Sequence, residues 1–192
     1  MQLASPGDRA VSDRLVIGGR QLELTLGDIT LEDVDAIANA ANEALRGGGG
    51  VDGAIHRAAG PNLLAELQAR YPEGTLTGTA VATEAYDLPS RWVLHAVGPI
   101  WRGGDHGEET LLADAYRSCL RLADELGARS VAFPAISMGI YGYPPHAGAR
   151  VAVRTVAEYL AGETSVDLAR FVLFSEETYA RFVGALEETD PS

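Results

Sequence analysis

Lysine is missing from this sequence of 192 residues, and all 15 of its basic residues are arginines. Without lysine, the chain cannot form a Schiff base with a substrate, and it cannot supply the lysine of a Walker-type phosphate loop. The sequence thereby excludes the classes of enzyme that depend on either group.

Cysteine occurs once, as Cys119, so the chain can form no internal disulfide, which fits a reducing compartment. The histidines lack the close spacing of metal ligands, and one cysteine cannot complete a zinc site of the usual kind. They are His56, His95, His106 and His146. We therefore expect no bound metal.

The first 20 residues also lack a long apolar run. Residues 1–20 carry Asp8 and Asp13 among their arginines, so we expect neither a signal peptide nor a membrane span there. Positive charge is scarce throughout, because 27 acidic residues outnumber 15 basic ones and give a net charge of -12. That charge repels phosphate backbones and anionic lipids, so we expect no nucleic acid or membrane partner. Since neither a signal peptide nor a membrane span is expected, the protein should be soluble and cytoplasmic.

The length and a hydrophobic content of 46% favour a single domain with a sizeable core. Residues 1–20 mix proline, glycine, serine and charge without periodicity, which predicts a loosely ordered N-terminal extension. Residues 21–187 are expected to fold as the domain, and residues 188–192 are expected to form a short tail.

Strand-like and helix-like segments alternate along the domain. Strands are predicted at 22–26, 36–40, 81–85, 92–97, 131–133 and 171–174. Helices are predicted over 108–126, after Pro144–Pro145 as far as Gly162, over 52–70 with a break at Gly60–Pro61, and over 176–186. Because parallel strands need crossover helices, we predict a three-layer α/β/α fold with a central mixed, largely parallel sheet.

Four successive glycines, Gly47–Gly50, lie between a predicted strand and a predicted helix. Glycine lets the backbone adopt positive φ and lets a ligand approach without interference from a Cβ atom. The N–H groups of such a loop, together with the helix N-terminus, would stabilise an anion. The alternative is a flexible connection in which Asp52 is an ordinary N-cap.

A second glycine-containing loop, residues 137–144, also follows a strand and precedes a helix. Two such loops at the ends of neighbouring strands could hold a diphosphate between them with backbone N–H donors. Taken alone, Asp28 fits a turn residue, an N-cap or an acceptor for a ligand amine. Taken alone, Phe174 fits a core residue at the end of the last strand.

Four segments follow one another with the order and spacing of a known pattern. They are Gly27-Asp-Ile-Thr30, Asn39-Ala-Ala-Asn42 with the glycine run and residues 51–60, Leu94–Trp101, and Phe133–Pro144. This pattern resembles that of the MacroD-type macrodomains, and the resemblance covers about residues 20–187. It implies a macrodomain fold and a hydrolase that binds ADP-ribose.

The resemblance also implies a role for each matching residue. The residue matching Asp28 binds the adenine amino group with Ile29 beside it, and the aromatic residue matching Phe174 packs against the adenine and the proximal ribose. Asn42 contacts the distal ribose, and Asp52 matches the acid implicated in hydrolysis, so these two are the predicted catalytic residues. The distal ribose and the diphosphate are held by Gly49, Gly50 and Val51, and by Ser137, Met138, Gly139, Ile140 and Tyr141.

The implied reaction is hydrolysis of an ester between the distal ribose and an acyl group, which is a Glu or Asp side chain of a modified protein or a free acetyl group. Water is the nucleophile, and Asp52 orients or deprotonates it with help from a phosphate oxygen of the substrate. No metal or redox cofactor is required. The expected partners are ADP-ribose and its esters, and ADP-ribosylated proteins.

Two other functions stay open. A reader module would bind ADP-ribose without turning it over, but Asn42, Asp52 and the full glycine run together favour the enzyme. A nucleotide-dependent oxidoreductase is suggested only by the spacing of Gly48, Gly50 and Gly53. The acidic strand end that a Rossmann turn requires about 20 residues later is not found, since that region is predicted to be a loop.

Two histidines and two departures from the family pattern complete the prediction. His56 and His95 are expected to be buried or partly buried and held by local hydrogen bonds, although His56 follows Asp52 by four residues and could share its helix face.

The sequence departs from the family pattern at two positions, where Met138 replaces a usual threonine and Ala85 replaces a common glycine. Because methionine offers no hydroxyl group, we expect altered affinity rather than lost binding.

Overall fold

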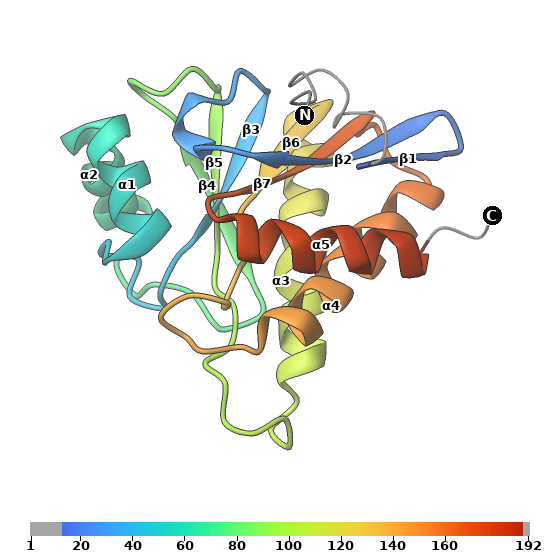
Figure 1. Ribbon diagram of the computed structural model, residues 1–192. Helices are drawn as coiled ribbons and strands as arrows, with labels where there is room; N and C mark the ends of the chain where they lie inside the picture. The colour runs from blue at the N-terminus through green and yellow to red at the C-terminus, as the bar shows by residue number, and fades with distance from the viewer. Residues whose placement is uncertain (1–12, 190–192) are drawn as a thin grey trace, which may run out of the picture.

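The computed structural model describes residues 13–189 and has one sheet between two layers of helices (Figure 1). The strands follow the order β1-β2-β7-β6-β3-β5-β4, with β1 and β4 antiparallel to their neighbours and the inner strands parallel. The predicted three-layer fold with a mixed, largely parallel sheet is confirmed. The strands are β1 (Arg14–Ile17), β2 (Arg20–Leu26), β3 (Ala36–Ala40), β4 (Ala80–Glu84), β5 (Trp92–Ala96), β6 (Ser130–Phe133) and β7 (Leu168–Leu173).

Proline and glycine mark several of the helix ends. Proline is the first residue of α2 and of α4, where its missing N–H has no partner to lose. Gly127 ends α3 in the left-handed conformation, with φ +69°. One sheet face is covered by α1 (Gly50–Ala59) and α2 (Pro61–Arg70), and the other by α3 (Glu108–Leu126), α4 (Pro145–Ala161) and α5 (Glu176–Thr189), while the short turn η1 (Ile29–Leu31) follows β2 (Figure 1).

The core is divided by the sheet into two main clusters, as the alternation of side chains along β3 shows. Ala36 and Ala38 face the larger cluster, which lies under α3, α4 and α5. Ile37, between them, packs in the cluster that contains Ile55 of α1. Successive strand residues point to opposite faces, so a central strand that is apolar at every position can serve both helical layers.

The N-terminal prediction is wrong for residues 14–20, which form β1 and the turn into β2 rather than a loose extension. Each of the four residues of β1 pairs with a residue of β2, and Leu15 is buried. Gly18 and Gly19 form the turn with φ +56° and +86°, the conformation of a tight two-residue hairpin. This glycine pair is the feature of the sequence that indicates the hairpin. Residues 1–12 lie outside the described part of the chain.

The other predicted elements are present with shifted ends. The first of the two helices predicted over 52–70 begins at Gly50, and Gly49 is its N-cap, so Asp52 lies inside the first turn rather than at the cap. β7 ends at Leu173, which leaves Phe174 outside the sheet. The last helix continues to Thr189, so residues 188 and 189 are not a tail, and 190–192 lie outside the described residues.

Two further properties concern the whole described region. None of the helices in residues 13–189 combines the length and the apolar character needed to cross a membrane. Over the same residues, no group of three or more His, Cys, Asp or Glu side chains is arranged to hold a metal ion. Cys119 of α3 is a free thiol in the core, and burial raises its pKa.

The loop before α3 is fixed by one buried carboxylate. Glu108 accepts hydrogen bonds from the backbone N–H groups of Arg102, Gly104 and His106 at 2.7 to 3.2 Å. Burial by itself raises the pKa of Glu108, but the backbone N–H donors outweigh it and hold the pKa at about 2, against an ordinary value of 4.5. The ionised side chain therefore ties a glycine-rich loop to the helix.

Glutamine at position 108 should make the fold less stable at neutral pH and less sensitive to acid. A carboxyl group whose pKa is lower in the folded state stabilises the fold above its ordinary pKa, and this contribution is lost as the pH falls from about 4.5 towards 2. Thermal unfolding from pH 7 to pH 2 should therefore show a steeper fall in Tm for the wild type than for Glu108→Gln. Glu125→Gln, an exposed position on the same helix, is the control. Parallel curves for all three proteins would contradict this assignment.

Candidate functional site

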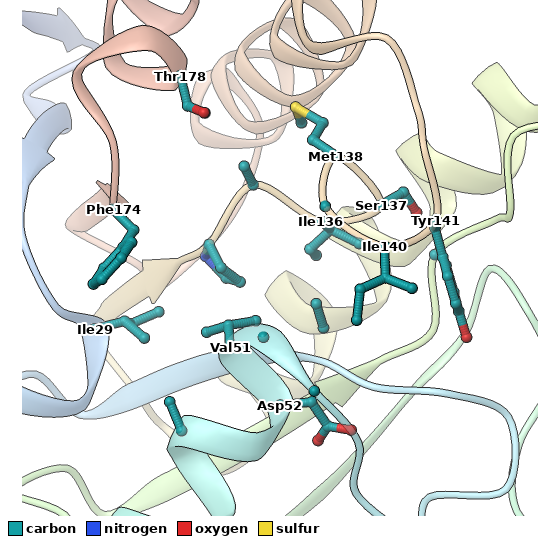
Figure 2. A pocket seen from close by; sticks show the side chains of 18 of the residues that line it. Ile29, Val51, Asp52, Ile136, Ser137, Met138, Ile140, Tyr141, Phe174 and Thr178 are labelled. Carbon is teal, nitrogen blue, oxygen red and sulfur yellow. The ribbon is translucent and has the colours of Figure 1, made fainter.

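A cavity of about 700 Å³ opens at the carboxyl ends of β2, β3, β6 and β7. Ligands of open α/β sheets bind in this position, because loops from neighbouring parallel strands meet there. The close view shows Ile29 and Phe174 towards one end of the cavity, Val51 in the middle, and Asp52 and Tyr141 towards the other end (Figure 2). The lining comes from residues 27–29, 40–42, 48–52, 54, 57, 98, 134–141, 172–175 and 178.

The first glycine loop joins β3 to α1 and presents backbone donors to this cavity. Gly47 and Gly50 have φ +80° and +60°, which only glycine adopts without strain. Within residues 13–189, the N–H groups of residues 48–52 donate no hydrogen bond to the protein, whereas Gly53 N–H donates to Gly49 O. Free N–H groups at the positive end of a helix dipole form an anion site.

The two predicted catalytic side chains meet at Gly48. Asn42 Nδ2 donates to Gly47 O at 3.0 Å and so ties the loop to the end of β3. A Cβ atom on Gly48 would lie 3.3 Å from Asp52 Oδ2 and 3.7 Å from Asn42 Nδ2. Asn42 and Asp52 therefore border one place, and the glycine between them keeps that place open.

Asp52 is held by contacts on one of its two oxygens. The side chain belongs to a residue that is only 5% exposed, and its Oδ1 accepts a hydrogen bond from Asn39 Nδ2 at 2.8 Å. His56 Nε2 lies 3.3 Å from the same Oδ1, in a histidine that is partly buried as expected. The pair that the sequence analysis set aside is thus in contact. Oδ2, beside Gly48, has no hydrogen bond to the protein in residues 13–189.

The second loop, residues 134–143, is shaped by its own backbone hydrogen bonds. Tyr143 N–H donates to Ser137 O at 2.9 Å, and Gly142 N–H donates to Gly139 O at 3.0 Å. Ser137 takes a φ of +67°, a costly conformation for a residue with a side chain. The N–H groups of Ser137, Gly139, Ile140 and Tyr141 have no acceptor in the described part of the protein. This loop is therefore a second set of free donors.

The two loops approach each other across the cavity. A Cβ atom on Gly49 would lie 3.2 Å from Ile140 Cδ1, although the Ile140 side chain is 79% exposed. The segment after β5 supports the second loop, since Trp101 N–H donates to Tyr141 O at 2.8 Å. The free donors of both loops border one space, which is the geometry predicted for a diphosphate.

The opposite end of the cavity is built by the segments after β2 and β7. Asp28 Oδ1 accepts from Thr30 N at 2.9 Å and from Thr30 Oγ1 at 2.7 Å, so Asp28 is the N-cap of η1. Ile29 behind it is buried. Phe174 is 88% exposed at the rim, so the interpretation of it as a core residue is wrong. An exposed ring beside a cavity offers a flat apolar face for stacking.

The charges in the lining are few. Arg57 on α1 is the single basic side chain among the lining residues, and Asp28 and Asp52 are the acidic ones. Burial raises the pKa of Tyr141, and the nearby carboxylates of Glu43 and Asp52 raise it further. The Tyr141 hydroxyl therefore stays protonated and available as a hydrogen-bond donor.

The sequence predicted the lining well, and the individual binding roles stay predictions. The lining residues to which it gave no role include Arg57, Gly98 and Thr178, of which Arg57 and Gly98 lay in segments already singled out. Ala85 is buried in the core and does not reach the cavity. Every predicted site residue does line it: Asp28, Ile29, Asn42, Gly49, Gly50, Val51, Asp52, Ser137, Met138, Gly139, Ile140, Tyr141 and Phe174.

Met138 belongs to the second loop, and its side chain packs against α4. A Cβ atom on Gly148 would lie 2.9 Å from Met138 Sδ, so the methionine covers the space that this glycine leaves. The side chain is partly buried against the larger core cluster. A flexible thioether fills such a gap well, and the loop keeps its free backbone donors despite the departure from the family pattern.

Comparisons with known proteins agree with this geometry. The family model for the Macro domain matches residues 38–152. An O-acetyl-ADP-ribose deacetylase of Cronobacter sakazakii is 53% identical over 173 residues, which are 88% of this chain and 96% of that protein.

Two solved structures are similar over most of the chain. A mutant of the Oceanobacillus iheyensis macrodomain with ADPR has a TM-score of 0.86 at 43% identity and covers 91% of this chain and 96% of its own. The Trypanosoma brucei macrodomain in complex with ADP-ribose has a TM-score of 0.79 at 40% identity and covers 86% and 68%.

Alanine at position 98 should destabilise the fold by forcing the second loop to move. Its Cβ atom would lie 2.2 Å from Ser137 Oγ and 2.6 Å from Ile136 Cγ2, so both residues must shift. Overpacking of this kind costs about 1–3 kcal/mol. Gly139→Ala in the same loop is the control, because a Cβ atom there meets nothing within 4 Å. Equal urea midpoints for the two variants would refute the close packing of Gly98.

Proposed function

This chain belongs to the macro domain family, and on that basis we propose that it is a hydrolase that binds ADP-ribose and cleaves an ester at the distal ribose. The observation that carries the proposal is the meeting of Asn42 and Asp52 at the end of a cavity bordered by two sets of free backbone donors. The relatives with ADP-ribose or ADPR bound and the deacetylase among the homologues support it.

The cavity accommodates ADP-ribose in one direction. The ring of Phe174 and the side chains of Ile29 and Asp28 suit an adenine, which needs a stacking face and an acceptor for its amino group. The free N–H groups of both loops suit the diphosphate, which an acidic protein without lysine must bind through its backbone. The distal ribose then lies beside Asn42 and Asp52.

The reaction follows from the state of the Asp52 carboxylate. Oδ1 is engaged by Asn39 and His56, and Oδ2 beside Gly48 is left to accept a proton from water. The water oxygen attacks the acyl carbon, its proton passes to Oδ2 with help from a phosphate oxygen of the substrate, and the bond from the acyl carbon to the ribose oxygen breaks. The ribose oxygen leaves with a proton, giving ADP-ribose and a carboxylic acid.

Two substrate classes fit this one reaction. O-acetyl-ADP-ribose and a Glu or Asp side chain linked to ADP-ribose are both carboxylic esters of the same sugar. They differ only in the acyl group, which extends from the open end of the cavity. We propose that the chain hydrolyses both, and that it therefore also acts on mono-ADP-ribosylated proteins. We place this activity in the cytoplasm, where the buried thiol of Cys119 stays reduced.

The deciding experiment compares matched substrates that carry ADP-ribose on acetyl, glutamate, serine and arginine. Release of ADP-ribose from the acetyl and glutamate esters, with none from the serine O-glycoside or the arginine N-glycoside, is the expected result. Tight ADP-ribose binding in calorimetry without release from any substrate would instead identify a reader module. Absence of any heat on addition of ADP-ribose would remove both functions.

Asparagine at position 52 should reduce turnover and spare binding. The new side chain keeps an oxygen for the hydrogen bond from Asn39 but cannot take a proton from water. Loss of general-base help should lower kcat by about 10²-fold or more, while the Kd of ADP-ribose should change little. Asp33→Asn, an exposed acid outside the cavity, is the control. Near-normal kcat in Asp52→Asn would exclude Asp52 as the base.

Alanine at position 174 should weaken binding and leave the chemical step intact. The Phe174 ring lies at the adenine end, and loss of an aromatic contact of this kind costs about 1 kcal/mol or more, which raises the Kd of ADP-ribose at least fivefold. Leu31→Ala is the matched control, because Leu31 is 75% exposed and lies outside the cavity lining. An unchanged Kd in Phe174→Ala, measured by calorimetry, would show that the adenine does not contact Phe174.

A further inference from the structure

A row of buried polar side chains leads from the edge of the sheet to the Asp52 carboxylate. Thr83 Oγ1 of β4 lies 2.9 Å from His95 Nε2 of β5, and His95 Nδ1 lies 3.2 Å from Asn39 Nδ2 of β3. The same Nδ2 donates to Asp52 Oδ1 at 2.8 Å. Thr83, His95 and Asn39 are fully buried, and neither Thr83 nor His95 lines the cavity. Buried polar groups in a sheet core need a reason, since apolar residues would pack there at less cost.

The sheet itself creates this row. Asn39 and His95 are direct partners in the parallel pairing of β3 and β5, and β4 pairs with β5 on the other side. Their side chains therefore lie on one face of three adjacent strands, the face that α1 covers with Asp52. The arrangement is set by strand register, so it does not depend on the conformation of a loop.

The hydrogen positions in the row follow from the carboxylate at its end. An ionised carboxylate only accepts, so the Asn39 amide must present its NH₂ group to Asp52, and the second hydrogen of that group points to His95 Nδ1. Nδ1 must therefore carry the lone pair and Nε2 the proton, which it donates to Thr83 Oγ1. The pKa of His95 is lowered to about 3, because burial and the neighbouring His56 lower it more than Asp52 raises it, so the ring is neutral at neutral pH.

We propose that His95, held by Thr83, is a positioning residue for ester hydrolysis, because it locks the Asn39 amide that fixes Asp52 Oδ1 and leaves Oδ2 for the attacking water. The inference rests on the proposed function and extends it to two residues that no substrate touches. Asp52 has a competing partner in His56 Nε2, 3.3 Å from the same oxygen. When the Asn39 amide is held in one orientation, its hydrogen bond fixes the orientation of the Asp52 carboxylate.

Valine at position 83 tests the row from its remote end. It keeps the shape of threonine but removes the acceptor for His95 Nε2–H, which leaves a buried donor unpaired and favours the other tautomer of the ring. The proton on Nδ1 would then face the NH₂ group of Asn39 and displace it. We expect kcat for O-acetyl-ADP-ribose to fall about tenfold, in line with small displacements of catalytic groups, with KM and the Kd of ADP-ribose within about twofold of wild type.

Two variants serve as controls. Thr83→Ser keeps the hydroxyl and should restore kcat to within about twofold of wild type. Thr155→Val is a matched buried substitution on α4, since Thr155 is 1% exposed and its hydroxyl has no partner in the described residues. It should leave kcat unchanged. A kcat of Thr83→Val equal to that of Thr155→Val, or a Thr83→Ser kcat as low as that of Thr83→Val, would overturn the proposal.

Nitrogen-15 NMR of the His95 ring gives a readout that needs no substrate. The wild type should show the neutral ring with its proton on Nε2, and Thr83→Val should show a proton on Nδ1 in a substantial share of molecules. A proton on Nδ1 in the wild type would refute the row as described. If the wild-type protein fails to hydrolyse any ester, the proposed function is wrong, and the ring tautomers still decide whether Thr83 and His95 orient Asn39.

Discussion

The structure depends on one electrostatic constraint, which is that a strongly acidic chain without lysine presents an anion site through backbone N–H groups. Such groups are free only where the chain has left one element and has not completed the hydrogen bonds of the next. Parallel strands place several of these transitions at one edge of the sheet. The loops after β3 and β6 use this edge, and the unusual backbone at Gly47, Gly50 and Ser137 is the conformational cost of keeping their donors turned towards one space.

At the same edge, the Asp52 carboxylate lies close to the N–H groups that would bind an anion, and two like charges repel each other. Side chains from the interior of the sheet hold this carboxylate in place. Asp52 lies in the first turn of α1, where the helix dipole favours a negative charge. Asn39 and His56 engage one oxygen, Oδ1, and the other oxygen lies beside Gly48. The sheet thus supplies side chains that hold Asp52 as well as the shape of the cavity, because β3 supplies the amide and β5 supplies its partner.

Sequence patterns predicted most of this fold and most of the cavity lining, and the errors have physical causes. Periodicity located the helices because each buries one face, and glycine runs located both loops. The hairpin of β1 and β2 was missed because β1 has only four residues, Arg14–Ile17, and so shows no period, although Gly18 and Gly19 mark the turn. Phe174 taken alone fitted a core residue, because apolar character does not tell whether a residue after a strand turns inwards, and only the family resemblance assigned it to the site. The row from Thr83 to Asp52 depends on strand register, which no local pattern specifies.

The burial of Cys119 in α3 has a practical consequence for following ligand occupancy. Its thiol is enclosed by the core and its pKa is raised, so alkylating reagents will not modify it in the folded protein. Amine-reactive dyes find no side chain to label, since lysine is missing. A cysteine introduced at the exposed rim position of Ile140 would therefore be the single reactive thiol, and a fluorophore attached there would report directly on the filling of the cleft.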